Sequence, residues 1–220
     1  MQLIIGNKNY SSWSLRPWYL MRRTGIDFDE TCLRFGVDFA ARIGEYSGAR
    51  RVPVLIDGDR HVWESLAICE YLAERFPEKR LWPADVGERA WARSIAAEMH
   101  AGFGALRDAL PMNCRAADRR VEIGADVARD IERIQAVWRE CRETFADAGP
   151  WLFGAFSVAD AMFAPVASRL RTYGIDLGTA ESVYVQTVLG DPVYLQWIAD
   201  ARVEPEVVEH EEVGIVRAQQ

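Results

Sequence analysis

Along residues 1–80, short runs of apolar residues alternate with segments in which apolar residues recur at the spacing of a helix. The apolar run at 3–5 predicts a buried strand, and the pattern over 14–24 predicts a helix that Gly25 stops. A second, weaker strand is predicted at 32–35. These elements follow one another in the order strand, helix, strand.

A β-hairpin and one more helix complete this first part. Residues 54–56 and 61–63 are strand-like and flank Asp57-Gly58, a turn-forming pair. A helix is predicted to begin at Ser65, and its core-facing positions are Leu66, Cys69, Leu72 and Phe76. A crossover unit followed by a hairpin predicts an α/β domain with a mixed sheet, ordered β-α-β and then β-β-α.

The remainder of the chain shows only helical spacing. Residues 81–88 are predicted to form a linker after Pro77, and residues 89–205 an all-helical domain. The first apolar stripe, ended by Pro111, comprises Trp91, Ile95, Met99, Phe103, Leu106 and Leu110. The second comprises Val121, Val127, Ile131, Ile134, Trp138, Cys141 and Phe145.

Local signals mark three further points in this half. Ser157 and Asp160 are spaced as a capping box that opens a buried helix. Asp191-Pro192 fits an N-cap followed by proline at the first helical position. Residues 206–220 are rich in glutamate, and we expect an acidic, loosely held tail.

Charge and composition narrow the class of protein. The formal net charge is −7, which argues against a duplex nucleic-acid partner, and 50% hydrophobic residues indicate a globular fold. The beginning of the chain lacks the pattern of a secretory signal, so a cytoplasmic location is expected. The nearly uncharged run 148–168 contains Asp160 and Pro165, and is interpreted as a core helix with its entry loop rather than a membrane span.

Neither cysteines nor histidines suggest a metal site. Cys32, Cys69, Cys114 and Cys141 are widely separated, and no pair has the C-x-x-C spacing. A disulfide framework is not expected in a chain of this size without export. The three histidines have no partner three or four residues away, so no metal is predicted.

Three segments carry candidate chemistry, and each also has a purely structural interpretation. Residues 10–17, Tyr-Ser-Ser-Trp-Ser-Leu-Arg-Pro, place hydroxyls at a helix start, where an anion is favoured; Ser12 or Ser14 could instead be a simple N-cap. Arg51-Val52-Pro53 enters a strand, and a cis proline there would expose the Val52 backbone to an extended ligand; an ordinary strand-initiating proline is the alternative.

The third segment is Glu64-Ser65 at the next helix start. Ser65 as N-cap, with nearby amides, could hold a carboxylate, while Glu64 could pair with an ammonium group. An amino acid would satisfy both residues. A plain cap beside a surface acid is the alternative.

Together these segments resemble the cytosolic glutathione transferases over residues 1 to about 203. VPVLIDGDRHVWESLAICEYLAERFP is similar to the glutathione-binding half of that family, SVADAMFAPV to its buried capping-box helix, and SSWSLR to the serine motif of the zeta class and related bacterial proteins. The resemblance implies a thioredoxin-like domain at 1–80, followed by the helical domain that holds the electrophile. It further implies that Arg51, Val52, Pro53, Glu64 and Ser65 bind glutathione.

The resemblance also implies a mechanism. Ser11 is expected to donate its hydroxyl to the glutathione sulfur, with Ser12 and Tyr10 as the other candidates. The co-substrate would lie between the domains, near Trp13, His100 and Arg107. Zeta-like members have cysteine where this chain has Trp13, which argues against thiol-disulfide chemistry and weakens the case for maleylacetoacetate isomerisation.

The expected activity is therefore glutathione transfer to a small electrophile. Glutathione-dependent isomerase or peroxidase activity and a non-catalytic scaffold of the same fold are the alternatives. Glutathione enters as co-substrate with no tightly bound cofactor, and a homodimer is implied, in which the first domain of one chain packs on the helical domain of the other. Neither nucleic acid nor membrane is expected as a partner.

Overall fold

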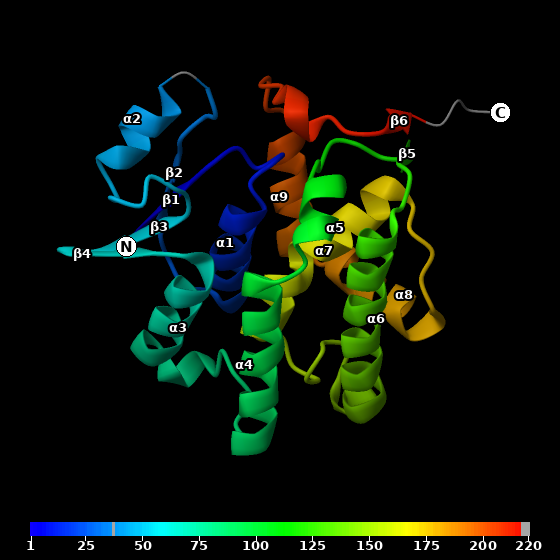
Figure 1. Ribbon diagram of the computed structural model, residues 1–220. Helices are drawn as coiled ribbons and strands as arrows, with labels where there is room; N and C mark the ends of the chain where they lie inside the picture. Colours follow the sequence, from blue (N-terminus) through cyan, green and yellow to red (C-terminus); the bar gives the residue numbers. More distant parts are fainter. Residues whose placement is uncertain (37, 217–220) are drawn as a thin grey trace.

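A four-stranded mixed sheet organises the first part of the chain in this computed structural model, which describes residues 1–36 and 38–216 (Figure 1). The strands are β1 (Gln2–Ile5), β2 (Asp29–Cys32), β3 (Val54–Asp57) and β4 (Arg60–Trp63), in the order β2-β1-β3-β4. β1 is parallel to β2 and antiparallel to β3, and β3 pairs antiparallel with β4. The expected mixed sheet is confirmed.

Helices cover both faces of this sheet. Side chains alternate along β1, so Leu3 and Ile5 pack with α1 (Ser12–Thr24) and α3 (Ser65–Arg75). Ile4 points to the opposite face, where it packs with Ile43 of α2 (Phe39–Gly44). The sheet is therefore buried on both sides, as its short apolar strands require.

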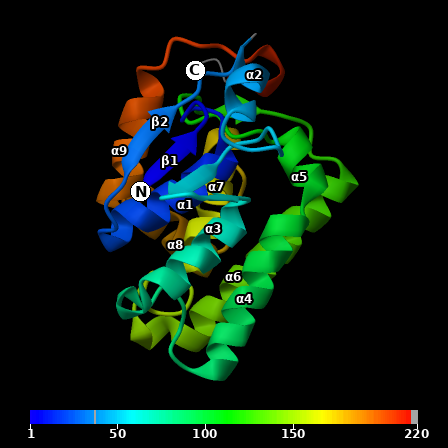
Figure 2. The ribbon, with the colours of Figure 1, turned by 90° about the vertical axis from the view of Figure 1, so that its left-hand side faces the viewer.

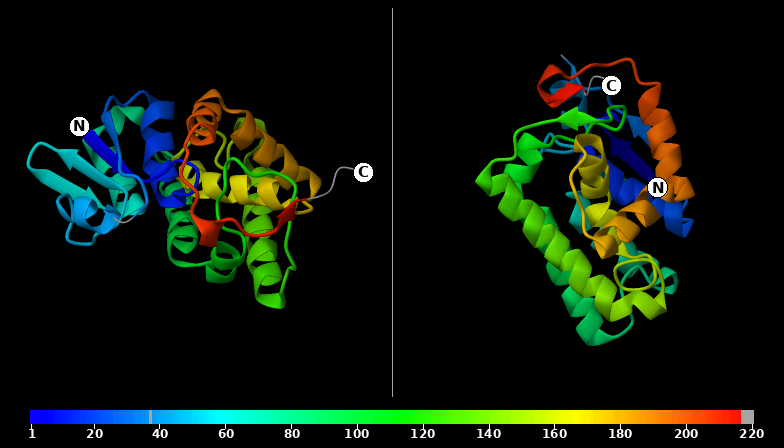
Figure 3. Two further views of the ribbon diagram at one scale, coloured as in Figure 1. Left: turned by 90° about the horizontal axis from the view of Figure 1, so that it is seen from above. Right: turned by 90° about the vertical axis from the view of Figure 1, so that its right-hand side faces the viewer.

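The second part is helical throughout its core. Its helices are α4 (Val86–Ala101), α5 (Gly104–Ala109), α6 (Ala125–Phe145), α7 (Val158–Tyr173), α8 (Thr179–Gly190) and α9 (Pro192–Arg202). Helix α7 is buried along almost its whole length and packs against α1, α4 and α8. The left view of Figure 3 shows the two parts side by side, with α1 next to the helical part, and in Figure 2 the sheet part faces the viewer.

Short elements complete the chain. Turns of 3-10 helix lie at Pro77–Lys79, Ala146–Ala148 and Glu209–Glu211, and β5 (Arg119–Arg120) pairs antiparallel with β6 (Ile215–Val216). Within residues 1–36 and 38–216, no helix combines the length and the apolar character needed to cross a bilayer.

Several predicted boundaries are corrected by the structure. The first helix begins at Ser12 rather than residue 14, and the second strand ends at Cys32 instead of spanning 32–35. The strand lies earlier because its register with β1 pairs Gln2 with Asp29 and Ile5 with Cys32. The hairpin and the helix after it are confirmed.

The first apolar stripe is not one helix. Phe103 adopts a left-handed backbone conformation with φ 59°, which separates α4 from α5. Arg107 donates to the carbonyls of Gly102 and His100 at 2.9 and 3.2 Å and so completes the hydrogen bonding of this break. The second stripe was also too long, because α6 begins at Ala125 and leaves Val121 outside it.

The two caps predicted in the helical part are confirmed, but the loosely held tail is not. Ser157 and Asp160 form the capping box of α7, and Asp191 caps α9. Residues 204–212, in contrast to the expectation, are bound by hydrogen bonds to the first part of the chain. Residues 217–220 of the predicted tail lie outside the described residues.

Candidate functional site

Two adjoining cavities lie between the sheet and the helical part. The first, about 330 Å³, is lined by Trp13, Arg51, Val52, Pro53, Trp63, Glu64, Ser65, His100 and Ala101. The second, about 420 Å³, is lined by Tyr10, Ser11, Ser12, Trp13, Phe35, Phe39, Arg50, Arg51, Val52, Arg107, Asp108, Arg169 and Glu211. Trp13, Arg51 and Val52 line both, so an extended ligand could pass from one cavity to the other. All of the residues predicted for the site are therefore brought to its walls.

The start of α3 forms one end of the first cavity. Glu64 occupies the N-cap position with φ 70°, a strained conformation for a residue with a side chain, and Ser65 is the first helical residue. The prediction that Ser65 is the N-cap was thus wrong by one residue. Ser65 is fully buried, and its Oγ accepts from Nη1 of Arg16 at 3.5 Å. The Val52–Pro53 peptide bond at the adjoining wall is cis.

The two serines at the start of α1 have different partners. Ser11 is the N-cap: its Oγ accepts from the Ser14 amide at 3.4 Å and donates to Ser14 Oγ at 2.7 Å. The cap was expected at Ser12 or Ser14, but Ser14 Oγ instead accepts from the amide of Gly6 at 3.1 Å. Ser12 Oγ accepts from Nη2 of Arg169 at 3.2 Å, and its own proton has no acceptor among the residues the structure describes.

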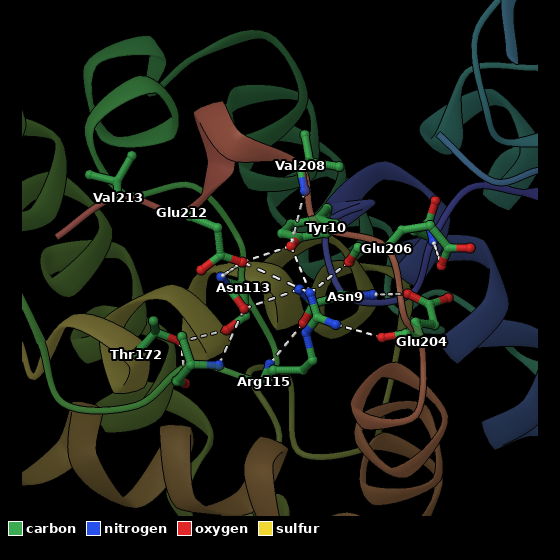
Figure 4. A network of polar contacts seen from close by, with 12 residues as sticks. Asn9, Tyr10, Asn113, Arg115, Thr172, Glu204, Glu206, Val208, Glu212 and Val213 are labelled. Atoms are coloured by element: carbon green, nitrogen blue, oxygen red, sulfur yellow. Dashed lines mark hydrogen bonds and ion pairs between the residues drawn. The ribbon is translucent and has the colours of Figure 1, made fainter. Parts of the chain in front are cut away.

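Tyr10 directs its hydroxyl to the C-terminal segment (Figure 4). It donates to Oε1 of Glu212 at 2.7 Å and accepts from Nη2 of Arg115 at 2.7 Å. Burial, followed by the hydrogen bond to Glu212, raises the pKa of Tyr10. The hydroxyl is thus occupied, although Tyr10 lines the second cavity.

Arginines surround Trp13. The guanidinium carbon of Arg16 lies 4.1 Å from the centre of the Trp13 ring, and that of Arg107 lies 4.6 Å from it. Burial, and then the charge of Arg107, lower the pKa of Arg169 to about 10 and that of Arg16 well below its usual value. Within the described part of the chain, none of these three guanidinium groups forms an ion pair with a carboxylate.

His100 contacts both Trp13 and Glu64. Its ring meets the Trp13 ring edge-on, with centroids 5.2 Å apart, and its Nε2 lies 3.5 Å from a Glu64 oxygen. Burial, and then the charge of Arg16, lower the pKa of His100, so the imidazole is neutral at pH 7. The residues predicted to surround the electrophile, Trp13, His100 and Arg107, therefore form one cluster.

Sequence reasoning missed Arg169 and Glu211 as lining residues of this site, and it gave no role to Arg16, although Arg16 lies within the candidate segment 10–17. Arg169 meets Ser12 across 157 positions of sequence, and Glu211 comes from the segment expected to be loose. Burial raises the pKa of Glu211, against the effect of Arg169. No local pattern marks such residues, because their significance depends on the tertiary fold. Across residues 1–36 and 38–216, three or more potential metal-ligating side chains do not gather at one point.

Comparisons with known proteins agree with this architecture. A family model for the glutathione S-transferase N-terminal domain matches residues 10–75, and one for the C-terminal domain matches residues 124–200. The chain belongs to the glutathione S-transferase family.

The relatives found include proteins of the zeta class. The chain is 27% identical over 138 residues to a zeta-class glutathione S-transferase of Euphorbia esula, covering 62% of this chain and 57% of the relative. It is 29% identical over 97 residues to a probable maleylacetoacetate isomerase of Caenorhabditis elegans, covering 44% and 45%. The aligned part thus spans about half the length of these curated relatives.

Solved structures share the fold over nearly the whole chain. A glutathione transferase homologue from Burkholderia, determined with bound glutathione, superposes with a TM-score of 0.71 and 24% identity, covering 91% of this chain and 97% of that one. A maleyl pyruvate isomerase described as a bacterial zeta-class glutathione S-transferase gives a TM-score of 0.71 and 18% identity, covering 94% and 100%. These similarities establish the thioredoxin-like sheet followed by a helical domain.

Proposed function

We propose that this protein binds glutathione across the two cavities and stabilises its thiolate for attack on a small electrophile. The observation that carries the proposal is the placement of Glu64-Ser65 in one cavity and Ser11-Ser12 in the other, with Val52 lining both. A tripeptide with a charged amino-acid end and a thiol fits such an arrangement. The family models support it independently.

The residues of the first cavity hold the γ-glutamyl end. Glu64 takes the α-amino group, for which its partly exposed carboxylate is available beside neutral His100. Ser65 and the first amides of α3 take the α-carboxylate, since helix N-termini favour anions. The backbone of Val52 pairs with the cysteinyl unit, and Arg51 and Pro53 complete the wall.

The second cavity then receives the thiol. A free thiol titrates near pH ~8.5, so the thiolate must be stabilised for attack at neutral pH. The hydroxyl of Ser12 can donate to sulfur, and the hydrogen bond it accepts from Arg169 strengthens it as a donor. The thiol proton leaves to solvent, and the sulfur forms a bond to the electrophilic carbon. In a substitution the leaving group departs with its bonding electrons; in an addition the π electrons of the double bond move to the neighbouring atom. No tightly bound cofactor takes part.

A specific feature favours a second candidate, glutathione-dependent isomerisation of an unsaturated carboxylate. The guanidinium groups of Arg107 and Arg169 line the thiol cavity, as do Asp108 and Glu211, but neither guanidinium forms an ion pair with a carboxylate of the described chain. They would hold an anionic co-substrate. The thiolate would add to the double bond, rotation would follow, and expulsion of the thiolate would restore the bond in the other geometry. Conjugation and isomerisation share the first step.

Two broader features belong to the same proposal. Four free cysteines suit a reducing cytoplasm. Trp63, half-exposed on the edge strand β4, suits a homodimer interface. We retain the predicted units at 1–80, 81–88 and 89–205 as the working division of the chain, although α4 begins at Val86, inside the predicted linker.

Binding of glutathione by calorimetry tests the core of the proposal. Glu64→Gln and Ser65→Ala should each weaken binding by about tenfold or more, because charge-assisted hydrogen bonds contribute about 1.5–3 kcal/mol. Glu78→Gln, an exposed change elsewhere on the first domain, is the matched control and should bind as wild type. If both site variants bind glutathione with unchanged affinity, the γ-glutamyl end does not bind in this cavity.

Turnover of an unsaturated acid and of its methyl ester separates the candidate reactions. If the enzyme prefers the acid to the ester, and Arg107→Gln loses this preference, an anionic co-substrate is favoured. If the product is the other geometric isomer rather than a glutathione adduct, the reaction is isomerisation. Equal turnover of acid and ester would favour general conjugation. Glutathione binding without turnover of any electrophile would support the scaffold alternative.

A further inference from the structure

The segment that follows α9 returns to the sheet and binds the loop between β1 and α1. We call residues 204–212 the C-terminal clamp and residues 6–11 the β1–α1 loop. The carboxylate of Glu204 accepts two backbone hydrogen bonds, from the Lys8 amide at 2.7 Å and the Asn9 amide at 3.0 Å. Lys8 and Asn9 are buried, so these amides require an acceptor, and Glu204 supplies it.

The neighbouring loop residues are held by the same clamp. Glu206 accepts from Nδ2 of Asn7 at 3.0 Å, and Glu212 accepts from the hydroxyl of Tyr10 at 2.7 Å. Every residue from 7 to 10 therefore has a hydrogen bond to the clamp, through main chain or side chain. The loop ends at Ser11, whose amide donates to the Asn7 carbonyl at 2.8 Å, so fixing Asn7 also fixes Ser11.

The clamp is itself anchored to the helical part, as Figure 4 shows. Arg115 donates from Nη1 to the carbonyl of Glu204 at 2.5 Å and from Nη2 to that of Glu206 at 2.8 Å. Glu212 accepts from Nδ2 of Asn113 at 2.8 Å and from Nη2 of Arg119 at 2.7 Å. The loop is thus tied, through the clamp, to the domain that would receive the co-substrate.

We propose that the C-terminal clamp holds Ser11 and Ser12 in the geometry that stabilises the thiolate, and that Glu204 is the positioning residue through which it acts. This role rests on the function proposed above. Hydroxyl donors stabilise an anion only when they are fixed in advance at the position it occupies. A loop with two unsatisfied amides would not keep them there.

Three variants isolate the contribution of Glu204. Glu204→Ala removes both acceptor oxygens, whereas Glu204→Gln keeps one. The second variant can therefore still be measured if the first folds poorly. Glu209→Ala is the matched control, since Glu209 is exposed on the same segment and its side chain makes no hydrogen bond or ion pair with any described residue. It carries the same change in charge.

Hydrogen exchange and thiolate titration are measured on the full-length chain. In Glu204→Ala we expect the Lys8 and Asn9 amides to exchange about tenfold faster or more, because a partly buried charged acceptor is lost. The pKa of bound glutathione's thiol should rise and kcat fall, while the dissociation constant for glutathione changes little, since Glu64 and Ser65 are untouched. Glu204→Gln should lie between wild type and Glu204→Ala, and Glu209→Ala should match wild type.

Two outcomes would overturn the proposal. Unchanged loop exchange in both Glu204 variants would show that the clamp does not restrain the loop. Faster exchange with an unaltered thiol pKa and kcat would show that its role is structural only. If the wild-type protein binds no glutathione, the proposed function is wrong and the positioning role falls with it. This result is distinguishable, because glutathione binding by the wild type is measured before any variant is compared.

Discussion

At the residue scale, the hydrogen bonds of Ser11 and Ser12 distinguish two hydroxyls that look alike in the sequence. Ser11 uses its oxygen and its proton to cap α1, through Ser14. Ser12 accepts from Arg169 and keeps its proton available among the described residues. Although the resemblance implied Ser11 as the donor to sulfur, this pattern leads us to favour Ser12.

Ser12→Ala should therefore raise the pKa of the bound thiol more than Ser11→Ala does. Losing a donor to a developing anion costs on the order of 2–3 kcal/mol, whereas loss of the Ser11 cap should mainly reduce stability, by about 1 kcal/mol. Thiolate absorbance of bound glutathione against pH, together with denaturant unfolding, separates the two effects. Tyr10→Phe serves as a further comparison. A larger pKa rise in Ser11→Ala would return the role to Ser11.

The site residues that could be predicted from sequence are those that occur in local patterns. Ser11, Ser12, Glu64 and Ser65 all lie at helix starts, where hydroxyls and acids have a recognisable place. Arg169 lies deep in α7, and its approach to Ser12 depends on how α7 packs against α1. Such a contact has no signal along the chain.

At the element scale, the capping box at the start of α7 is recognisable from a few residues of sequence, yet it also fixes the loop before the helix. Asp160 is fully buried and accepts from the amides of Ser157 at 2.9 Å and Leu152 at 3.0 Å. It therefore joins the capping box to the loop before the helix. Burial outweighs these hydrogen bonds and raises the pKa of Asp160 to about 6.

Asp160→Asn should destabilise the protein, with a cost that grows as pH falls. Because the folded-state pKa lies above the unfolded value, the native state binds the proton more tightly, and Asp160 adds stability below about pH 4 that is lost as pH rises through about 6. The variant lacks this gain. Denaturant unfolding at pH 4.5 and 7.5 should show a larger difference from wild type at pH 4.5, by about 2 kcal/mol. An equal difference at both values would contradict the shift.

The elements that sequence could not place are those whose ends depend on distant partners. The first stripe keeps helical spacing through Phe103, yet the helix ends there. Arg107 donates to the backbone carbonyls that the end of the helix leaves without a partner. The acidic tail looks solvated because its charges are counted without Arg34, Arg115 and Arg119, the ion-pair partners of Glu206 and Glu212 that lie far from it in sequence. The hairpin and both caps were predictable, since their hydrogen bonds close within a few residues.

At the scale of the whole molecule, we expect a homodimer. β4 is an open edge of the sheet, and Trp63 on it is 50% exposed, although it also lines the first cavity. Proteins commonly cover or protect such edges, and a second copy of the chain would cover this one. Light scattering should give twice the 24.9 kDa of one chain. Trp63→Ser should shift the protein toward monomer, whereas Val183→Ser, an exposed apolar change on α8, should not. A single-chain mass across micromolar concentrations would contradict the dimer.

The two parts of each chain should unfold in one transition, because helix α1 belongs to both cores. One face of α1 packs on the sheet and another on α7, where Nε of Arg16 donates to the carbonyl of Met162 at 3.2 Å. Met162→Ala, a change in the helical part, should lower the stability of the sheet as well, by about 2–5 kcal/mol as is usual for a buried large-to-small substitution. Amide exchange of β1 and of α7 should accelerate together in this variant. Exchange that accelerates only in α7, or two separate denaturation transitions, would show instead that the domains fold independently.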